Sequence, residues 1–423
     1  MKILDWIKGK FSRDKPQNRY TFSTFPFFFG KSISGKTVDD FTAMQNSAVY
    51  ACVKVIAESI ASLPLHVYEY KDGGKEKAVE HSLYFLLHDS PNPEMTSFIF
   101  RETMLTHLLL RGNAYAQIQR NNAGRVIGLY PLSASKMTVE RNDAGEIQYR
   151  YRVYTEENPN IRNKGEIIFP RTDILHIAGL GFDGLIGYSP IAMAKNAIGL
   201  SIACEEFGNN FFANGAKPSG ILKTPTLIKD PTKLQESWQS MYGGENAGKV
   251  AILEQGMEYQ QISVPPEDAQ FLQTRKFQIA EIARIFRVPL HLLNELDHAT
   301  FSNIAHQSLE FVIYTLTPYI ARIEQVFNKA LFLPSERGKY FVKFNVDGML
   351  RGDIKSRYEA FAVGRQNGWL SANDIRELED LNKIPTDEGG NLYLINGNMT
   401  KLSDAGLFGK KNDGNNAAEE DKK

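Results

Sequence analysis

Few residues in this 423-residue chain have the type and spacing of a catalytic or cofactor site. The segment Gly179-Leu-Gly-Phe-Asp-Gly184 has the form Gly-x-Gly-x-x-Gly after a strand-like run. A dinucleotide site would also need a strand–helix–strand unit and a well-placed acid, and neither follows. Ser189 lies in Gly-Tyr-Ser-Pro, which lacks the second glycine of a nucleophile elbow, and it suits a helix cap better. No Walker-type phosphate-binding motif is present in the sequence.

The potential metal ligands are also poorly spaced. His291, His298 and His306 are seven and eight residues apart, whereas zinc sites use histidines four apart on a helix, or cysteines. Cys52 and Cys204 each lie in an apolar helical pattern and are interpreted as buried small hydrophobic residues. No paired carboxylates stand out in an apolar setting. We therefore expect no enzymatic activity, no metal and no cofactor, although a site assembled from distant residues would leave no such pattern.

Composition limits the remaining classes. The 49 basic and 49 acidic residues give zero formal charge, which disfavours a protein that grips nucleic acid through a large basic face. A hydrophobic fraction of 42% is enough for sizeable cores, and the length predicts two or three domains. No apolar run reaches the roughly 18 residues of a membrane span. The run in Met1–Phe11 is too short for a signal peptide, so we expect a soluble, cytosolic chain without membrane contact.

The hydrophobic pattern predicts a mixed organisation. Residues 1–40 are expected to be a partly disordered arm, whose aromatic cluster suggests docking onto its own domain or a neighbouring subunit. Residues 41–188 combine helical periodicity after Ser47 with short strands and Gly/Asn turns, which predicts an α+β domain. A helix over 189–214 begins at Ser189-Pro190.

The second half of the chain alternates long helices with small modules. Residues 215–266 are predicted to be a compact α/β insertion between the first helix and a second one over 267–288. A loop over 289–302 precedes a third long helix, from about 303 to 333, which Pro318 should kink. A strand follows within 303–349, then short helices over 350–400 and a disordered polar tail over 401–423.

Several motifs, each weak alone, occur together in a specific order. They are Ser47-Ala-Val-Tyr-Ala-Cys-Val-Lys-Val-Ile-Ala-Glu-Ser-Ile-Ala-Ser-Leu-Pro-Leu-His66, Ser90-Pro-Asn-Pro-Glu-Met-Thr-Ser97, Leu110-Arg-Gly-Asn-Ala-Tyr115, Gly184-Leu-Ile-Gly-Tyr-Ser-Pro-Ile191, Phe211-Phe-Ala-Asn-Gly-Ala216, Asp268-Ala-Gln-Phe-Leu272, Glu281-Ile-Ala-Arg-Ile-Phe-Arg-Val-Pro289, Ala299-Thr-Phe-Ser-Asn303 and Asp347-Gly-Met-Leu-Arg-Gly-Asp353. With them, residues 41–400 resemble the portal (head–tail connector) proteins of tailed bacteriophages, in the family common among long-tailed phages and prophages.

The resemblance implies an α+β portal fold with named parts. Residues 41–188 and 303–349 would form the wing, which includes the long kinked helix. Helices 189–214 and 267–288 would form the stem, with the clip (215–266) between them. Residues 289–302 would be the tunnel loop and residues 350–400 the helical crown.

The resemblance also implies a role in the virion. The family forms rings, usually of twelve subunits, at one capsid vertex, through which DNA is packaged and ejected. Implied partners are further copies of the chain, double-stranded DNA passing without sequence preference, the terminase large subunit, the major capsid protein, scaffold, and head-completion or adaptor proteins. Assembly would take place in the host cytoplasm. The alternatives are a monomeric, non-enzymatic adaptor or scaffold protein of phage assembly, and a nuclease or prohead protease with a dispersed site.

The residues expected to contact DNA or partners follow from those assignments. Candidates for the channel and tunnel loop are Arg275, Lys276, Arg284, Arg287, His291, Asn294, His298 and Thr300. Intersubunit ion pairing or plain solvation would explain the stem charges equally well. Arg287 stands where the family pattern would place a small residue such as glycine. Candidates for partner binding in the clip are Trp238, Gln239 and Tyr242; core packing would equally explain Trp238.

Overall fold

The computed structural model describes residues 29–71, 74–153, 165–213, 220–225, 230–242, 253, 256–261, 268–296, 301–346, 354–379 and 381–394. The predicted disordered tail over 401–423 and residues 1–28 of the predicted arm lie outside these ranges. The chain divides into two compact units, Met1–Val346 and Asp347–Lys423, which are described separately.

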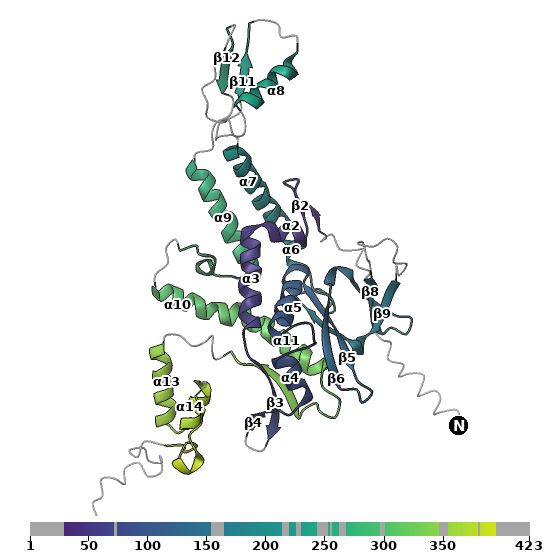
Figure 1. The fold of residues 1–423 in the computed structure, drawn as a ribbon, viewed down its shortest axis with the longest axis vertical. Coiled ribbons are helices and arrows are strands. Elements are labelled where there is room, and N and C mark those ends of the chain that lie inside the picture. Colours follow the sequence, from purple (N-terminus) through teal and green to yellow (C-terminus); the bar gives the residue numbers. More distant parts are fainter. Residues whose placement is uncertain are drawn as a thin grey trace, which may run out of the picture. The chain divides into compact units, whose positions relative to one another are not determined.

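The first unit is built on a helical core that Figure 1 shows at its centre. Helix α3 (Ser47–Ala61) buries Val49, Val53 and Ile56, which recur at three- and four-residue steps. It packs on α5 (Ser97–Arg111), and α2 (Asp40–Gln45) and α4 (Ser82–His88) lie against the pair. The predicted helix after Ser47 is therefore confirmed.

Arg101 joins the ends of two helices inside this core. Its guanidinium donates to the carbonyl of Ala61 at 2.7 and 3.2 Å and to that of Leu87 at 3.1 Å. These carbonyls lie in the last turns of α3 and α4, where helices leave acceptors unpaired. Burial lowers the pKa of Arg101 to about 10, so the group remains charged at neutral pH.

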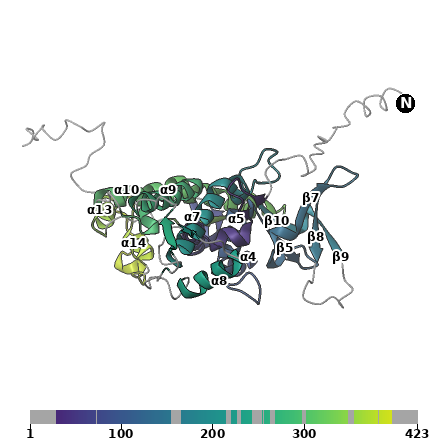
Figure 2. The same ribbon diagram turned by 90° about the horizontal axis from the view of Figure 1, so that it is seen from above.

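The strands form small antiparallel sheets, as the turn spacing predicts. One has the order β10-β5-β6, from Ile174–Ala178, Asn113–Arg120 and Val126–Leu132. Another has the order β7-β8-β9, from Met137–Arg141, Ile147–Val153 and Gly165–Pro170. Figure 2 shows β7, β8 and β9 on one side of α5 and α7. The third has the order β13-β3-β4, from Tyr340–Phe344, Leu65–Lys71 and Gly74–Lys77.

The described end of the arm docks on its own domain. Strands β1 (Gly30–Lys31) and β2 (Thr37–Val38) form a hairpin against α7. The backbone N–H of Ile33 donates to Asn196 Oδ1 at 3.2 Å, and Lys36 pairs with Glu206. A Cβ on Gly199 would lie 2.2 Å from Ser32 Oγ, so this glycine lets the hairpin approach the helix.

The predicted single helix over 189–214 is two helices in the structure. Helix α6 (Pro190–Met193) begins with Ser189, whose Oγ accepts from the N–H of Ala192 at 3.1 Å as predicted. It ends at Ala194, and α7 (Lys195–Ala213) follows and packs against α9 (Asp268–Phe286). The break was missed because Ala194 carries no helix-breaking signal.

The insertion between α7 and α9 contains a two-stranded sheet and one helix. Strands β11 (Gly220–Lys223) and β12 (Glu258–Gln261) pair antiparallel, beside α8 (Pro231–Tyr242) in Figure 1. Trp238 of α8 stacks on Tyr259 of β12 with 6.2 Å between ring centroids. The predicted α/β character of this insertion is thus present among its described residues.

The third long helix is interrupted where proline predicts. Helix α10 (Phe301–Glu310) continues as a π-helical segment, η6 (Phe311–Leu316), and then as α11 (Thr317–Ala330), whose first turn contains Pro318. The Thr317 hydroxyl and its backbone N–H both donate to the carbonyl of Val312. The irregularity therefore precedes the proline, and π-helical turns are a recognised cause of kinks.

The second unit is a small helical module. It contains α13 (Ile354–Gln366), α14 (Ala372–Leu378) and the short 3-10 helix η7 (Thr386–Glu388). Ser371 caps α14, since its Oγ accepts from the N–H of Asp374 at 3.1 Å and its N–H donates back to that carboxylate at 2.7 Å. Arg357 of α13 forms an ion pair with Glu379.

The glycine-rich segment after β10 is a turn built on close backbone contacts. A Cβ on Gly181 would lie 1.9 Å from the carbonyl oxygen of Ile186, and one on Gly187 would lie 2.1 Å from that of Gly112. Glycine is therefore required for packing at both positions.

A polar network fastens the same turn to the sheets. Asn113 Oδ1 accepts from the N–H of Gly187 at 2.8 Å, and its Nδ2 donates to the Gly187 carbonyl at 2.7 Å. His176 Nε2 lies 3.1 Å from the same Oδ1, and its Nδ1 lies 3.2 Å from the Tyr149 hydroxyl. This arrangement suits a neutral imidazole that donates through Nε2 and accepts at Nδ1. Burial, with a contribution from Arg171, lowers the pKa of His176 to about 3.

We predict that this histidine makes unfolding pH-dependent. Its ring stays neutral in the folded protein but takes up a proton in the unfolded chain below about pH 6.5. The free energy of unfolding should therefore fall as pH decreases, by about 1 kcal/mol between pH 7 and pH 5.5 from this group. Urea unfolding at both pH values measures the change.

Two variants separate this effect from the other histidines. His176→Gln should lose that part of the pH dependence, whereas His306→Gln, on the exposed surface of α10, should retain it. An unchanged pH dependence in His176→Gln would show that the His176 ring takes up its proton equally in the folded state.

Candidate functional site

Helix α9 has one face in the core and one on the surface. Gln278, Ile282, Ala283 and Phe286 are buried where the helix contacts α3 and α7. Arg284 is exposed, and Phe277, seven residues earlier on the same side, is 56% exposed. The exposed face therefore combines a cation with a large apolar side chain.

The four cations predicted to line a channel do not share one face. Arg275 and Arg284 are nine residues apart on α9, about two and a half turns at 3.6 residues per turn, so they project from opposite sides. Lys276 lies within about a quarter turn of Arg284, and its side chain is exposed. Lys276 therefore lies between the other two around the helix, about 80° from Arg284 and about 100° from Arg275, and all three side chains are exposed.

Arg275 lies beside an acidic group of α7. Burial raises the pKa of the Glu205 carboxyl, and the charge of Arg275 partly offsets that rise. Asn46, at the start of α3, donates through Nδ2 to Glu205 Oε1 at 3.3 Å and to Ser201 Oγ at 2.9 Å. Arg275, whose side chain is exposed, therefore lies at the edge of the contact between α7 and α9, close enough for its charge to act on Glu205.

Arg287 occupies a left-handed turn that ends α9. Its φ is +57°, its N–H donates to the carbonyl of Arg284 at 3.2 Å, and the N–H of Val288 donates to that of Ala283 at 2.9 Å. These two bonds are those of a Schellman motif, in which the left-handed residue is usually glycine. The expectation of a small residue at position 287 thus has a backbone cause, and the Arg287 side chain is exposed.

A buried hydroxyl ties this turn to the interrupted helix. Thr315 Oγ1 donates to the backbone carbonyl of Arg287 at 2.6 Å. Thr315 is only 3% exposed and belongs to the π-helical segment η6. Sequence reasoning missed this residue, and its only signal was a hydroxyl within the otherwise apolar run Phe311–Leu316.

The first part of the predicted tunnel loop is anchored to α10. A short 3-10 helix, η5 (Leu290–Leu293), is followed by Asn294, which adopts φ +62° and exposes its side chain. His291 is half-buried, with Nδ1 2.9 Å from Gln307 Oε1 and Nε2 3.3 Å from Ser308 Oγ. His298 and Thr300 lie outside the described residues.

In the insertion, the three predicted contact residues all belong to α8. Trp238 is half-buried against Tyr259, so part of its ring serves packing within the module. Gln239 and Tyr242 follow on the same helix, but their side chains lie outside the described part. Asp230 caps this helix, with Oδ1 3.3 Å from the N–H of Lys233.

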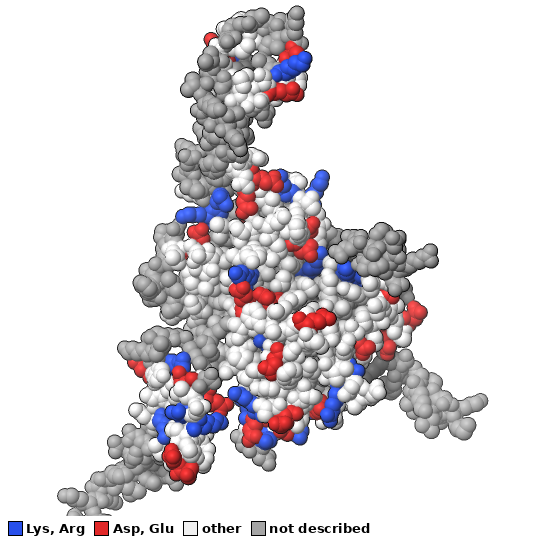
Figure 3. All heavy atoms as spheres, viewed as in Figure 1, with Lys and Arg blue, Asp and Glu red and all other residues white. Residues whose placement is uncertain are grey.

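The described residues contain no group of three or more potential metal ligands. Burial raises the pKa of the Cys52 thiol to about 12, which leaves no thiolate at neutral pH. Figure 3 shows acidic and basic side chains intermixed on one face, without a continuous basic stripe there. No helix among the described residues has the length and apolarity to cross a membrane.

Comparisons with known proteins agree with these features. Residues 47–380 match the family model described as "Phage portal protein". The chain is 35% identical over 381 residues to the portal protein of Enterobacteria phage HK97, covering 88% of this chain and 87% of the relative. It is also 35% identical over 383 residues to the probable portal protein of Streptomyces phage phiC31, covering 88% and 82%.

Solved structures share the fold. A chain from the neck of a native gene transfer agent particle, computed with C12 symmetry, matches with a TM-score of 0.55 and 24% identity, covering 81% of this chain and 92% of that one. An HK97 family phage portal protein from Corynebacterium diphtheriae matches with a TM-score of 0.55 and 15% identity, covering 74% and 98%. These matches confirm the predicted α+β fold class.

The left-handed turn predicts the effect of one substitution. Arg287→Gly should raise the free energy of unfolding by about 0.5–1 kcal/mol, because glycine avoids the cost of a left-handed conformation, about 1–2 kcal/mol, at a smaller entropic loss. Arg284→Gly, three residues earlier within the helix, should instead lower it by about 1 kcal/mol. Urea unfolding of both variants measures the difference. A loss of stability in Arg287→Gly would mean that its side chain contributes more than its backbone costs.

Proposed function

The chain belongs to the phage portal protein family, and we propose that twelve copies form a ring at one capsid vertex, with a central channel for double-stranded DNA. The observation that carries this proposal is the 35% identity to the HK97 portal protein over 88% of the chain. The fold shared with a chain of a particle neck computed with C12 symmetry supports the subunit number.

The surface of the single chain supports assembly into a larger structure. Phe277 of α9 and Ile313 and Tyr314 of η6 are 56%, 45% and 63% exposed. Large apolar side chains of this kind are typical of surfaces that become covered by a partner. Other copies of the chain around the ring are the proposed partners for these surfaces.

The ring would serve two stages of the virus cycle. In the host cytoplasm it would dock the terminase large subunit and join the major capsid protein and scaffold. In the finished virion it would bind head-completion or adaptor proteins and release DNA through the same channel. In this proposal the chain itself makes and breaks no covalent bonds.

The parts of the chain receive roles by the same proposal. The wing would comprise residues 41–188 and 303–349, the stem residues 189–214 and 267–288, and the clip residues 215–266. Residues 289–302 would form the tunnel loop and residues 350–400 the crown. Trp238, Gln239 and Tyr242 of the clip remain candidates for contact with the motor and head-completion proteins.

DNA of any sequence must slide through such a channel without being held. A lining with many cations would neutralise phosphates and retain the duplex, since each phosphate contact adds salt-dependent affinity. A neutral chain with few exposed cations on α9 suits this requirement. Of the residues predicted for the channel, we assign DNA contact to Lys276 and Arg284, and interaction with Glu205 of α7 to Arg275.

The tunnel loop would combine an anchored start with a contact segment. Hydrogen bonds between the His291 ring and the side chains of Gln307 and Ser308 hold its beginning against α10. We therefore assign His291 a positioning role, and we assign contact with DNA to Asn294, His298 and Thr300. Arg287 would present its charge where α9 turns into this loop.

Ring formation is the first prediction of this proposal. Light scattering of the purified protein should give twelve times 47.7 kDa, about 572 kDa, and negative-stain images of the same fraction should show rings with a central hole. A monomer that remains single when mixed with major capsid protein and scaffold would contradict the ring and favour the adaptor alternative.

The face of α9 gives a second prediction. Arg284→Ala should still form rings but should package severalfold less DNA into procapsids, because an exposed positive charge that guides the duplex is lost. Arg275→Ala, the same change on the opposite side of the helix, should leave packaging near the wild-type level.

Two results would overturn the assignment of this face. Loss of rings in Arg284→Ala would make Arg284 a contact between subunits. An equal loss of packaging in both variants would show that the two sides of α9 do not differ toward DNA.

A further inference from the structure

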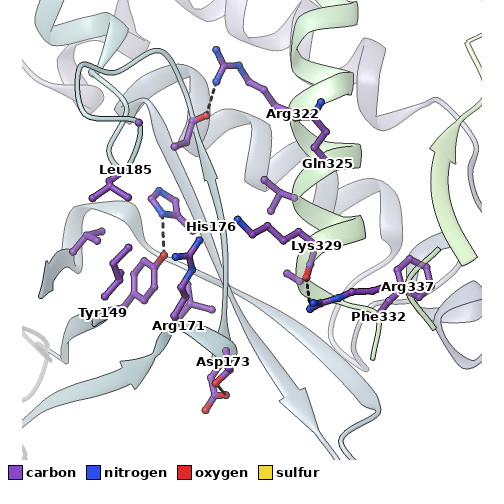
Figure 4. A pocket seen from close by; sticks show the side chains of 18 of the residues that line it. Tyr149, Arg171, Asp173, His176, Leu185, Arg322, Gln325, Lys329, Phe332 and Arg337 are labelled. Carbon is purple, nitrogen blue, oxygen red and sulfur yellow. Dashed lines mark hydrogen bonds between the residues drawn. The ribbon is translucent and has the colours of Figure 1, made fainter. Parts of the chain in front are cut away.

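An open cleft of about 910 Å³ lies in the first unit. None of its described lining residues belongs to α9. One wall is α11 with the turn that follows it, and the other is formed by β8, β10 and the glycine-rich turn, as Figure 4 shows. All of its lining residues belong to the first unit.

The wall surfaces of the cleft are largely apolar. Val326 and Leu333 contribute from the side of α11, and Val139, Ile147 and Leu185 from the opposite side. Leu180, also in the lining, is 76% exposed, which is unusual for a leucine in a tight turn. A hollow of this size with exposed apolar side chains is typical of a binding site rather than a packing defect.

The cleft is strongly positive although the chain is neutral. Its lining contains five cations, which are Arg120, Arg171, Arg322, Lys329 and Arg337. The only acidic residue in the described lining is Asp173, so the formal charge of the lining is +4. Within the described ranges, none of the five forms an ion pair with a carboxylate. Burial lowers the pKa of Arg120, the charge of Asp173 partly offsets this, and repulsion from Arg337 lowers the pKa further by a smaller amount.

Three of these arginines are held by neutral groups. Arg120 donates to the carbonyls of Gly124 and Ala330 at 3.0 and 2.7 Å. Arg322 donates to that of Ala178 at 3.0 Å, and Arg337 to that of Lys329 at 3.1 Å. The carbonyls fix the guanidinium groups in place without neutralising them, so the positive charge remains available to a ligand.

We propose that this cleft binds an extended, acidic peptide segment of a partner protein, one that carries apolar side chains between its carboxylates. Carboxylates would pair with Arg171 and Lys329, whose side chains are exposed on opposite walls. The apolar side chains would lie against Val326, Leu333 and Leu185. This proposal goes beyond the ring and channel, and it holds for a single subunit.

The spacing of the charges favours an extended ligand over a single small anion. Arg322 and Lys329 are seven residues apart on α11, about 10 Å along the helix axis. One phosphate or sulfate cannot reach both, whereas alternate side chains of an extended peptide can. A nucleic acid duplex would pair its phosphates with the cations. Its charged, hydrated backbone would, however, offer no apolar groups to pack against the apolar walls.

A labelled synthetic peptide tests the proposal with the full-length protein. The probe is a short fluorescent peptide of Asp and Glu alternating with Leu and Phe, and its binding is followed by fluorescence anisotropy. The double variant Arg171→Glu, Lys329→Glu should weaken binding at least about tenfold, because two attractive contacts become repulsive. Both side chains are exposed, so the variant should fold, which thermal unfolding checks.

A second variant controls for net charge. Lys31→Glu with Lys54→Glu makes the same change of charge at exposed positions outside the cleft lining, and it should leave peptide binding unchanged. A peptide with Ser in place of Leu and Phe should bind severalfold more weakly than the probe.

Three outcomes would overturn the proposal. They are no binding of the peptide by the wild-type protein, equal weakening in the two double variants, and binding of a short DNA duplex that depends on Arg171 and Lys329 while the peptide does not bind. The last would assign the cleft to nucleic acid instead. None of these measurements depends on ring formation, so they succeed or fail separately from the proposed function.

Discussion

The hydrogen bond from the Thr315 hydroxyl to the Arg287 carbonyl holds together the region on which the proposed role depends. A carbonyl just past a helix end has no partner in its own helix, and here a buried side chain supplies one. The bond joins the end of α9 to η6, and α3 contacts both. The buried face of α9 against α3 and α7 leaves Arg284 exposed, and this junction fixes the end of the helix in that packing.

Local sequence signals predicted the features that depend on a few neighbouring residues, such as helix starts and helix interruptions. Ser189 and Ser371 begin helices because a hydroxyl can accept from the first turn, and Pro318 marks an interruption because it lacks an N–H. The break at Ala194 has no such signal. The pairing of β13 with β3 was equally hidden, because it joins segments some 270 residues apart through backbone bonds that any sequence can form.

The sequence predicted which cations of α9 could contact DNA, but not which side of the helix each one occupies. The helical period of 3.6 residues places them on different sides. Arg275 and Arg284 look equivalent in sequence, but half a turn separates their directions, and only the packing of α9 against α7 shows that Arg275 is the one that lies near Glu205. The charged cleft left no sequence signal. Its cations are spread along the sequence from Arg120 to Arg337. The net charge of the whole chain is zero because acidic residues elsewhere balance them, so composition does not reveal the local excess.

The turn built on Gly112, Gly181 and Gly187 has a consequence for how the gene can vary. Every amino acid that a single-base change can substitute for glycine carries a Cβ, and at these positions that atom would collide with backbone, which cannot rotate away. No single-base change that replaces one of these glycines is therefore expected to preserve the packing of this turn. In a mutational scan these glycines should form a group of positions that tolerate only silent changes.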